Sequence, residues 1–167
     1  MISLALLFVL MVAQLTVAAP GTPVSLKTNF LDNPIGVDVR PHFAWTPAPS
    51  TLRLEPSAHV ASYELELYHI FVNGTSVLFW STRGDVPSVG IPRVQGPELV
   101  QYDGSDEEYQ WRVRVTDSTG AVSSWSDFAH FRTGILSQNE WTNAKWLLAA
   151  KDFRATFSTP SKVARAT

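Results

Sequence analysis

The stretch EYQWRVRVTDSTGAVSSWSDFAHF, from Glu108 to Phe131, combines an alternating pattern with two turn signals. Apolar and polar residues alternate from Tyr109 to Thr116, and a β-strand places successive side chains on opposite faces. The apolar residues therefore share one face, and the polar residues, including two arginines, share the other. A Ser-Thr-Gly turn and a Ser-Trp-Ser turn precede a second short apolar run. The stretch predicts two strands with one buried face and one solvated face.

Short apolar runs separated by turn residues occupy most of the chain. Pro, Gly, Asn, Asp and Ser interrupt them, and no long segment of helical period precedes residue 137. Strands are expected at residues 24–29, 42–46, 62–72, 76–81, 98–102, 108–117 and 127–133. This spacing is typical of two packed antiparallel sheets. The predicted fold is all-β, a seven-stranded antiparallel β-sandwich of the fibronectin type III or immunoglobulin-like type, with a C-terminal strand remnant.

The composition, with 45% hydrophobic and 17% charged residues, is typical of a globular protein. The formal net charge of −2 is too small to attract nucleic acid. Because the chain has no cysteine, disulfides and thiolate metal sites are excluded and the core must hold the fold together. The predicted core residues are Trp45, Tyr63, Leu65, Leu67, Trp111, Val113, Val115 and Phe131.

Four segments are predicted along the chain. Residues 1–19 have the apolar run and small-residue end of a signal peptide, which implies a secreted, extracellular protein with no membrane association after cleavage. An uncleaved anchor is the alternative, since about 20 residues span a bilayer. Residues 20–134 form the sandwich, and residues 135–146 form a linker with a short helical turn, because Ser137 to Glu140 matches a capping box. Residues 147–167 resemble the truncated start of a second β-sandwich.

Six short motifs follow one another between residues 26 and 146. They are N-P-I-G-V-D at 33–38, P-H-F-A-W at 41–45, Y-Q-W-R-V-R-V at 109–115, S-W-S at 124–126, F-R-T-G at 131–134 and W-x-x-A-K-W at 141–146. In this order they resemble the N-terminal fibronectin type III-like region of secreted bacterial-type α-L-rhamnosidases, which are glycoside hydrolases. The W-S-T-R-G run at 80–84 departs from the family's W-D-S-G pattern.

The resemblance implies that the catalytic acid and base lie in a helical barrel downstream, so no residue of this chain matches them. The expected function is that of a non-catalytic module which packs against or orients downstream domains of the same parent enzyme. A free-standing module that binds a carbohydrate or a protein is the alternative. A small complete enzyme is the third interpretation.

Two tryptophans are the candidate binding residues, because aromatic faces stack on sugar rings. These are Trp80 and Trp125; the other four are assigned to the core or to the boundary with the next domain. Trp125 also has a structural interpretation, in which Arg112 and Arg114 stack on its indole and stabilise the solvated face of the sheet.

The remaining motifs carry weaker predictions. Asn73-Gly74-Thr75 matches the N-x-[ST] glycosylation sequon, although an Asn-Gly hairpin turn explains the same residues. Glu64 and Glu66 share one strand face, where a solvated polar side is a better explanation than a glycosidase acid–base pair. The acidic residues between 103 and 108 are interpreted as a turn rather than a calcium site. No catalytic residue, metal ligand or cofactor is assigned.

Overall fold

The computed structural model describes residues 19–48, 59–87, 90–99 and 105–141, together with Lys145, Thr156 and Ser158. The chain divides into two compact units, residues 1–137 and 138–167. In the second unit a 3-10 helix, η1, spans Gln138–Trp141, where the sequence predicts a single helical turn. The predicted signal peptide and the predicted start of a second sandwich lie outside the described residues, apart from Ala19, Thr156 and Ser158.

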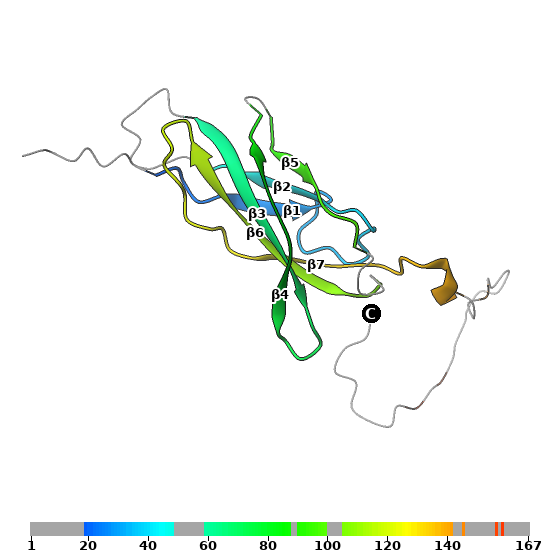
Figure 1. Ribbon diagram of the computed structural model, residues 1–167. Helices are drawn as coiled ribbons and strands as arrows, with labels where there is room; N and C mark the ends of the chain where they lie inside the picture. Colours follow the sequence, from blue (N-terminus) through cyan, green and yellow to red (C-terminus); the bar gives the residue numbers. More distant parts are fainter. Residues whose placement is uncertain are drawn as a thin grey trace, which may run out of the picture. The chain divides into compact units, whose positions relative to one another are not determined.

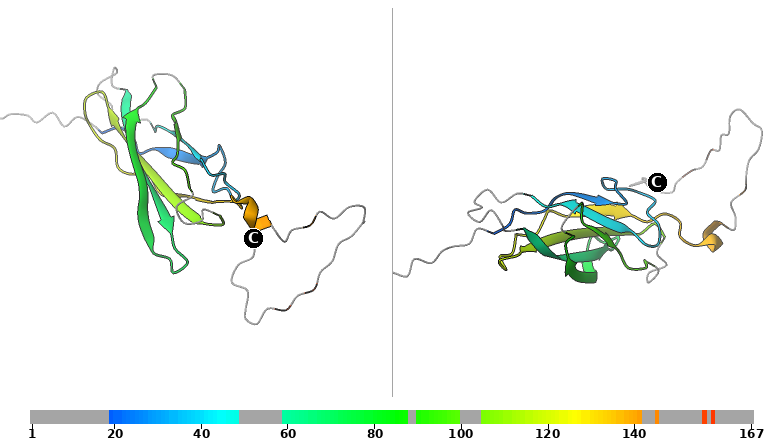
Figure 2. Two further views of the ribbon diagram at one scale, coloured as in Figure 1. Left: turned by 45° about the vertical axis from the view of Figure 1, so that its right-hand side comes forward. Right: turned by 90° about the horizontal axis from the view of Figure 1, so that it is seen from above.

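Two antiparallel sheets form the first unit. One contains β1 (Val24–Thr28), β2 (His42–Thr46) and β5 (Arg93–Gln95) in the order β1-β2-β5. The other contains β3 (Val60–Ile70), β4 (Ser76–Asp85), β6 (Glu108–Asp117) and β7 (Ala129–Arg132) in the order β4-β3-β6-β7. The sheets lie as two layers (Figures 1 and 2), which confirms the predicted β-sandwich.

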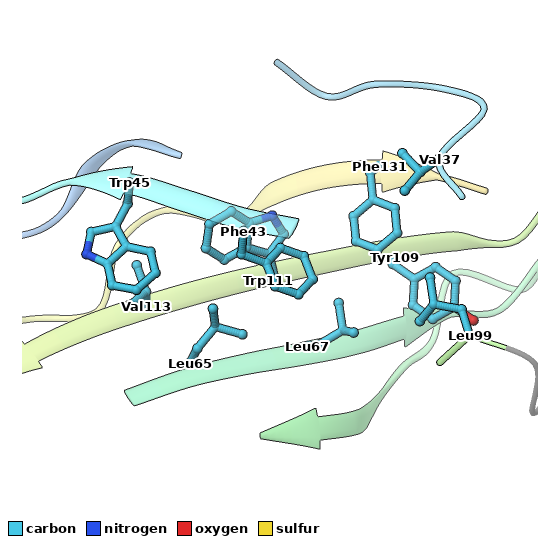
Figure 3. Packing of buried hydrophobic residues seen from close by; sticks show 10 residues of the cluster. All are labelled: Val37, Phe43, Trp45, Leu65, Leu67, Leu99, Tyr109, Trp111, Val113 and Phe131. Carbon is cyan, nitrogen blue, oxygen red and sulfur yellow. The ribbon is translucent and has the colours of Figure 1, made fainter. Parts of the chain in front are cut away.

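An aromatic core fills the space between the sheets (Figure 3). Its buried members are Val37, Phe43, Trp45, Leu65, Leu67, Leu99, Tyr109, Trp111, Val113 and Phe131. Seven of the eight predicted core residues are buried, and Val115 is among them. The eighth, Tyr63, is only partly buried and packs edge-on against Trp45 with ring centroids 5.2 Å apart. The alternation in β3 and β6 therefore identified the core positions of these two strands at Leu65, Leu67, Trp111 and Val113.

The fifth strand differs from the prediction, which placed it at residues 98–102. The structure has β5 at Arg93–Gln95, paired with β2 from His42 to Ala44. Of the predicted range, Glu98 and Leu99 are described and lie in no strand, while residues 100–102 lie outside the described residues. Leu99 lies in a loop, where its backbone nitrogen donates to the Val39 carbonyl at 2.9 Å while its side chain is fully buried. A loop residue thus contributes to the core. The three-residue strand β5 is difficult to recognise in the sequence because prolines and a glycine flank it.

Strand β4 is longer than predicted and contains a β-bulge. Leu67 pairs with Trp80 and Tyr68 pairs with Leu78, so Phe79 is the extra residue. A bulge changes which face the following side chains occupy. As a result two consecutive aromatic residues contact the core: Phe79 lies edge-on to Tyr109 at 5.7 Å, and the ring of Trp80 lies 6.5 Å from that of Phe43.

Residues 33–37, here called the edge segment, cover the outer edge of β7. The backbone nitrogen of Arg132 donates to the Pro34 carbonyl at 2.9 Å, and that of Val37 donates to the Arg132 carbonyl at 3.0 Å. Gly36 has a φ of +79°, and a Cβ on Gly134 would lie 3.3 Å from the Gly36 Cα. Two glycines in contact therefore let the edge segment approach β7 closely.

Candidate functional site on the outer sheet face

The outer face of the four-stranded sheet carries a ladder of charged side chains. The strand register places Arg83, Glu64 and Arg114 in one row across β4, β3 and β6. The next row contains Glu66 opposite Arg112. Opposite charges on adjacent strands attract each other. The solvated face predicted for β6 is therefore an ion-paired face shared by three strands.

Glu64 lies at the centre of the first row. Arg83 donates to its Oε1 at 2.6 Å, and the Nε of Arg114 donates to its Oε2 at 2.7 Å. Burial alone would raise the pKa of this carboxyl, but hydrogen bonds and charges from the two arginines outweigh it and hold the pKa below its ordinary value. Glu64 is consequently a structural anion at neutral pH.

Glu66 is bound in the same manner in the second row. The Nε of Arg112 donates to Glu66 Oε2 at 2.8 Å, and the Tyr68 hydroxyl donates to the same oxygen at 2.7 Å. Burial, together with this hydrogen bond to Glu66, raises the pKa of Tyr68. Both carboxylates are held by arginines, which supports the interpretation of this pair as the polar side of the sheet.

Trp125 lies under the guanidinium groups of the two β6 arginines. The Arg112 carbon Cζ is 4.5 Å from the centroid of the indole, and the Arg114 Cζ is 4.6 Å from it. Arg112 also lies 5.2 Å from the ring of Phe128. Cation–π attraction is favourable at these distances. The predicted Arg/Trp stack is confirmed, because both guanidinium groups lie over the indole.

Two serines hold the Trp125 segment against β6. The hydroxyl of Ser123 accepts from the Val115 nitrogen at 3.0 Å, and that of Ser126 accepts from the Val113 nitrogen at 3.1 Å. The serine backbone nitrogens donate to the carbonyls of the same two valines, at 2.8 and 2.9 Å. This role of the serines was not predicted, although the Ser-x-x-Ser spacing around a tryptophan is the signal for it.

The two candidate binding tryptophans are on different faces of the sheet. Trp80 is paired with the buried Leu67 and packs on the core, whereas Trp125 contacts arginines on the outer face. The structure therefore does not bring them together in one platform. Asn73, the sequon residue, lies in the exposed turn between β3 and β4.

A groove of about 590 Å³ adjoins the first row of charges. Its polar lining residues are Ser62, Glu64, Arg83, Asp85, Arg114 and Thr116, and Tyr63, Gly84 and Val122 also line it. Ser62 has a small side chain and is paired with Asp85 on one side and Thr116 on the other, which leaves the hollow between them. The groove thus offers hydrogen-bonding groups beside apolar surface.

In the part of the chain that the structure describes, three or more His, Asp or Glu side chains do not gather in a way that could hold a metal ion. Among the same residues, no helix has the length and apolar character needed to cross a membrane. In the predicted acidic turn, Asp106 binds Arg132 and Glu107 binds His69.

Two antiparallel sheets around an aromatic core, with an ion-paired outer face, define an immunoglobulin-like β-sandwich. The chain belongs to the family described as "Rha78A-like, N-terminal immunoglobulin domain", whose profile matches residues 23–137, more than half of the chain. This membership confirms the resemblance found in the ordered motifs.

Relatives named alpha-L-rhamnosidase agree with this assignment. The protein of Alteromonas sp. (strain LOR) is 31% identical over 171 residues, which cover 98% of this chain and 17% of the relative. That of Formosa agariphila is 28% identical over 131 residues, which cover 75% of this chain and 13% of the relative. The chain thus spans less than a fifth of the length of these curated relatives.

Solved structures give the same picture. The alpha-L-rhamnosidase from "Dictyoglumus thermophilum" matches with a TM-score of 0.57 and 28% identity, covering 78% of this chain and 14% of that one. The Streptomyces avermitilis enzyme, solved with L-rhamnose, matches with a TM-score of 0.52 and 22% identity, covering 72% and 11%. The second likeness shows the fold alone.

Proposed function

We propose that this chain is the leading, non-catalytic module of a secreted α-L-rhamnosidase-like glycoside hydrolase, and that it packs against and orients the domains that follow. The observation that carries the proposal is the small share of its relatives' length that the chain covers. The chain matches an N-terminal domain family and at most 17% of the length of its relatives. In the proposal, residues 1–19 direct export, residues 135–146 link the domains, and residues 147–167 begin a second sandwich.

Exposed apolar side chains at one end of the sandwich support the packing role. Phe30, Leu31 and Ile35 are 60, 59 and 75% exposed in the connection between β1 and β2. The edge segment that contains Ile35 runs to a bridge between Val37 and Thr133. This is the end at which the chain leaves β7. Apolar groups gathered at the exit are costly in water and suit a neighbouring domain.

The state of the carboxylates supports a module without catalysis. A glycosidase needs one carboxyl that can give a proton and a second that can attack or activate water. Glu64 and Glu66 both accept hydrogen bonds from arginines, and the lowered pKa of Glu64 makes it a poor acid. Their environment therefore favours ion pairing within the sheet.

A domain-exchange experiment tests the proposal. In the Alteromonas sp. enzyme, the matching N-terminal segment is deleted, or is replaced either by residues 23–137 of this chain or by an unrelated fibronectin type III domain. We expect the first replacement alone to restore the melting temperature and the hydrolysis of an aryl α-L-rhamnoside. The chain by itself should not hydrolyse the substrate. Hydrolysis by the chain alone, or equal behaviour of both replacements, would contradict the proposal.

Carbohydrate binding is a second candidate function, and the groove on the outer face, with its hydroxyl, charged and apolar lining groups, is the observation that favours it. Titration calorimetry with rhamnose-containing oligosaccharides tests this candidate. We expect binding heat that disappears when Ser62→Gln fills the hollow between Asp85 and Thr116. Because Ser62 lies on the outer face, this variant should fold normally. The absence of heat with the unmodified chain would remove the candidate.

A further inference from the structure

We propose that Asn73 in the β3–β4 hairpin is the attachment site of an N-linked glycan. The inference rests on the export that forms part of the proposed function, and it assigns a modification to a surface outside the charged ladder. Asn73-Gly74-Thr75 is the single N-x-[ST] sequon in the sequence. Such sequons are glycosylated in exposed loops of exported proteins.

The hairpin turn presents Asn73 in a defined conformation. The backbone nitrogen of Gly74 donates to the Phe71 carbonyl at 2.8 Å, and Gly74 has a φ of +82°, which suits a glycine. The carboxamide oxygen of Asn73 accepts from the backbone nitrogen of Thr75 at 3.0 Å and from its hydroxyl at 2.7 Å. The turn thus holds Oδ1, the atom that is not modified, and Nδ2 is not held by it.

Apolar side chains around the sequon provide a second, independent observation. Val72 at the hairpin tip is fully exposed, and Val77 and Leu78 on the other arm are 51 and 49% exposed. As consecutive residues of β4, Val77 and Leu78 lie on opposite faces of the hairpin. The C–H faces of the first sugars would lie against Val72 and against the exposed side chain on one of these faces. A glycan at Asn73 would therefore cover apolar side chains at the hairpin tip.

The modification is a simple transfer in which atoms balance. The donor is an oligosaccharide joined through its C1 to a lipid diphosphate. A bond forms between Asn73 Nδ2 and C1, the bond between C1 and the diphosphate oxygen breaks, and Nδ2 loses one proton. No oxidant or reductant takes part. The lipid diphosphate is the leaving group.

A glycan at this position also restricts where downstream domains can contact the sandwich. Glycans are bulky and remain in solvent. The hairpin tip would then stay outside any domain interface, even though it carries apolar residues. The exposed residues Phe30, Leu31 and Ile35 would be left as the contact surface. The glycan would thus cover the hairpin tip, and a downstream domain would cover Phe30, Leu31 and Ile35.

Expression in a glycosylating yeast tests the inference. The chain is produced once from its own Met1 and once behind a yeast secretion leader, and cell extract and medium are both analysed. We expect a mobility shift that an N-glycan-removing endoglycosidase abolishes. Asn73→Gln and Thr75→Ala should lose the shift, whereas the matched control Thr75→Ser, which keeps the sequon, should retain it. Mass spectrometry then locates the sugar on Asn73.

The two leaders separate failure of this inference from failure of the proposed function. If only the chain with the yeast leader is glycosylated, export by residues 1–19 is wrong and the acceptor site is correct. If the leader delivers the chain into the secretory pathway and no shift appears in either fraction, the acceptor site is wrong. A shift that persists in Asn73→Gln would also overturn the assignment.

Discussion

Trp125 shows how one side chain can organise a polar surface. Its indole gives Arg112 and Arg114 an apolar face on which to lie, and each arginine then reaches a glutamate on β3. Each glutamate offsets the charge of one arginine, and the ring adds attraction to both. The stack and the two ion pairs together therefore make this arrangement favourable.

Replacement of Trp125 by alanine should destabilise the domain. Both cation–π contacts disappear, and we expect the free energy of unfolding to fall by about 1–2 kcal/mol. Urea denaturation followed by circular dichroism measures the change. Trp125→Phe keeps an aromatic face and should cost less. Equal losses for the two variants would mean that an aromatic face at this position does not stabilise the domain.

Glu64 should make stability depend on pH. Its folded pKa is lowered, so its contribution is complete above the ordinary value of 4.5 and is lost as the pH falls through the lower folded value. Glu64→Gln should cost about 1–2 kcal/mol at pH 7, and the difference from the unmodified chain should shrink as the pH falls below 4.5.

Melting curves between neutral and strongly acidic pH check this prediction. Glu98→Gln, which removes an exposed ion pair with Arg40, is the matched control and should change stability only slightly. A constant difference between Glu64→Gln and the unmodified chain across the whole pH range would contradict the assignment.

At the scale of elements, a hydrogen bond within the core joins a strand of one sheet to a strand of the other. The indole nitrogen of Trp111 on β6 donates to the hydroxyl of Thr28 on β1 at 3.0 Å, and both residues are buried. The bond fixes how β1 lies over β6, because apolar contacts around it are less directional. A polar pair in an aromatic core thus sets the position of one sheet on the other.

A double-mutant cycle tests this link. Thr28→Val leaves the indole nitrogen buried without its acceptor and should cost about 1–3 kcal/mol. In a Trp111→Phe background the same change should cost much less, since the donor is already absent. Equal costs in both backgrounds, measured by urea denaturation, would mean that the hydrogen bond does not hold the sheets together.

The elements also show what sequence could and could not predict. The bounds of β6 agree with the prediction because its alternation is regular, and seven of eight core positions follow from such patterns. Strand β5 was missed because three residues between proline and glycine show no period. The bulge at Phe79 was missed because it depends on pairing with β3. Periodicity in the sequence indicates which residues of a strand are buried, but it does not indicate which strands pair with each other.

The outer face was predictable to a similar extent. The Arg/Trp stack followed from residues close together on β6 and in the next turn. The role of Glu64 in bridging Arg83 and Arg114 did not, because those arginines come from two strands 31 residues apart, and only the register brings them to one carboxylate. Likewise, the exposure of Trp80 could not be judged before the bulge was known.

At the scale of the whole molecule, the apolar end near the chain exit should matter only when further domains are present. Leu31→Asp with Ile35→Asp should shift the stability of the isolated chain by less than about 0.5 kcal/mol, since both side chains are exposed. In the Alteromonas sp. chimera the same pair should lower the melting temperature clearly. Val77→Asp on the hairpin is the control and should leave the chimera unchanged. A reversed pattern would place the domain interface on the hairpin.

The edge segment has a consequence for synthesis on the ribosome. Asn33 Oδ1 accepts a hydrogen bond from the backbone nitrogen of His130, 97 residues later. The edge segment, in the first third of the domain, therefore has its hydrogen-bond partner in the last strand. Contacts this distant in sequence slow folding, and domains fold as units during translation. A nascent chain must therefore wait, with its sheet edge open, until β7 has emerged from the exit tunnel, and chaperone contact should be concentrated in that interval.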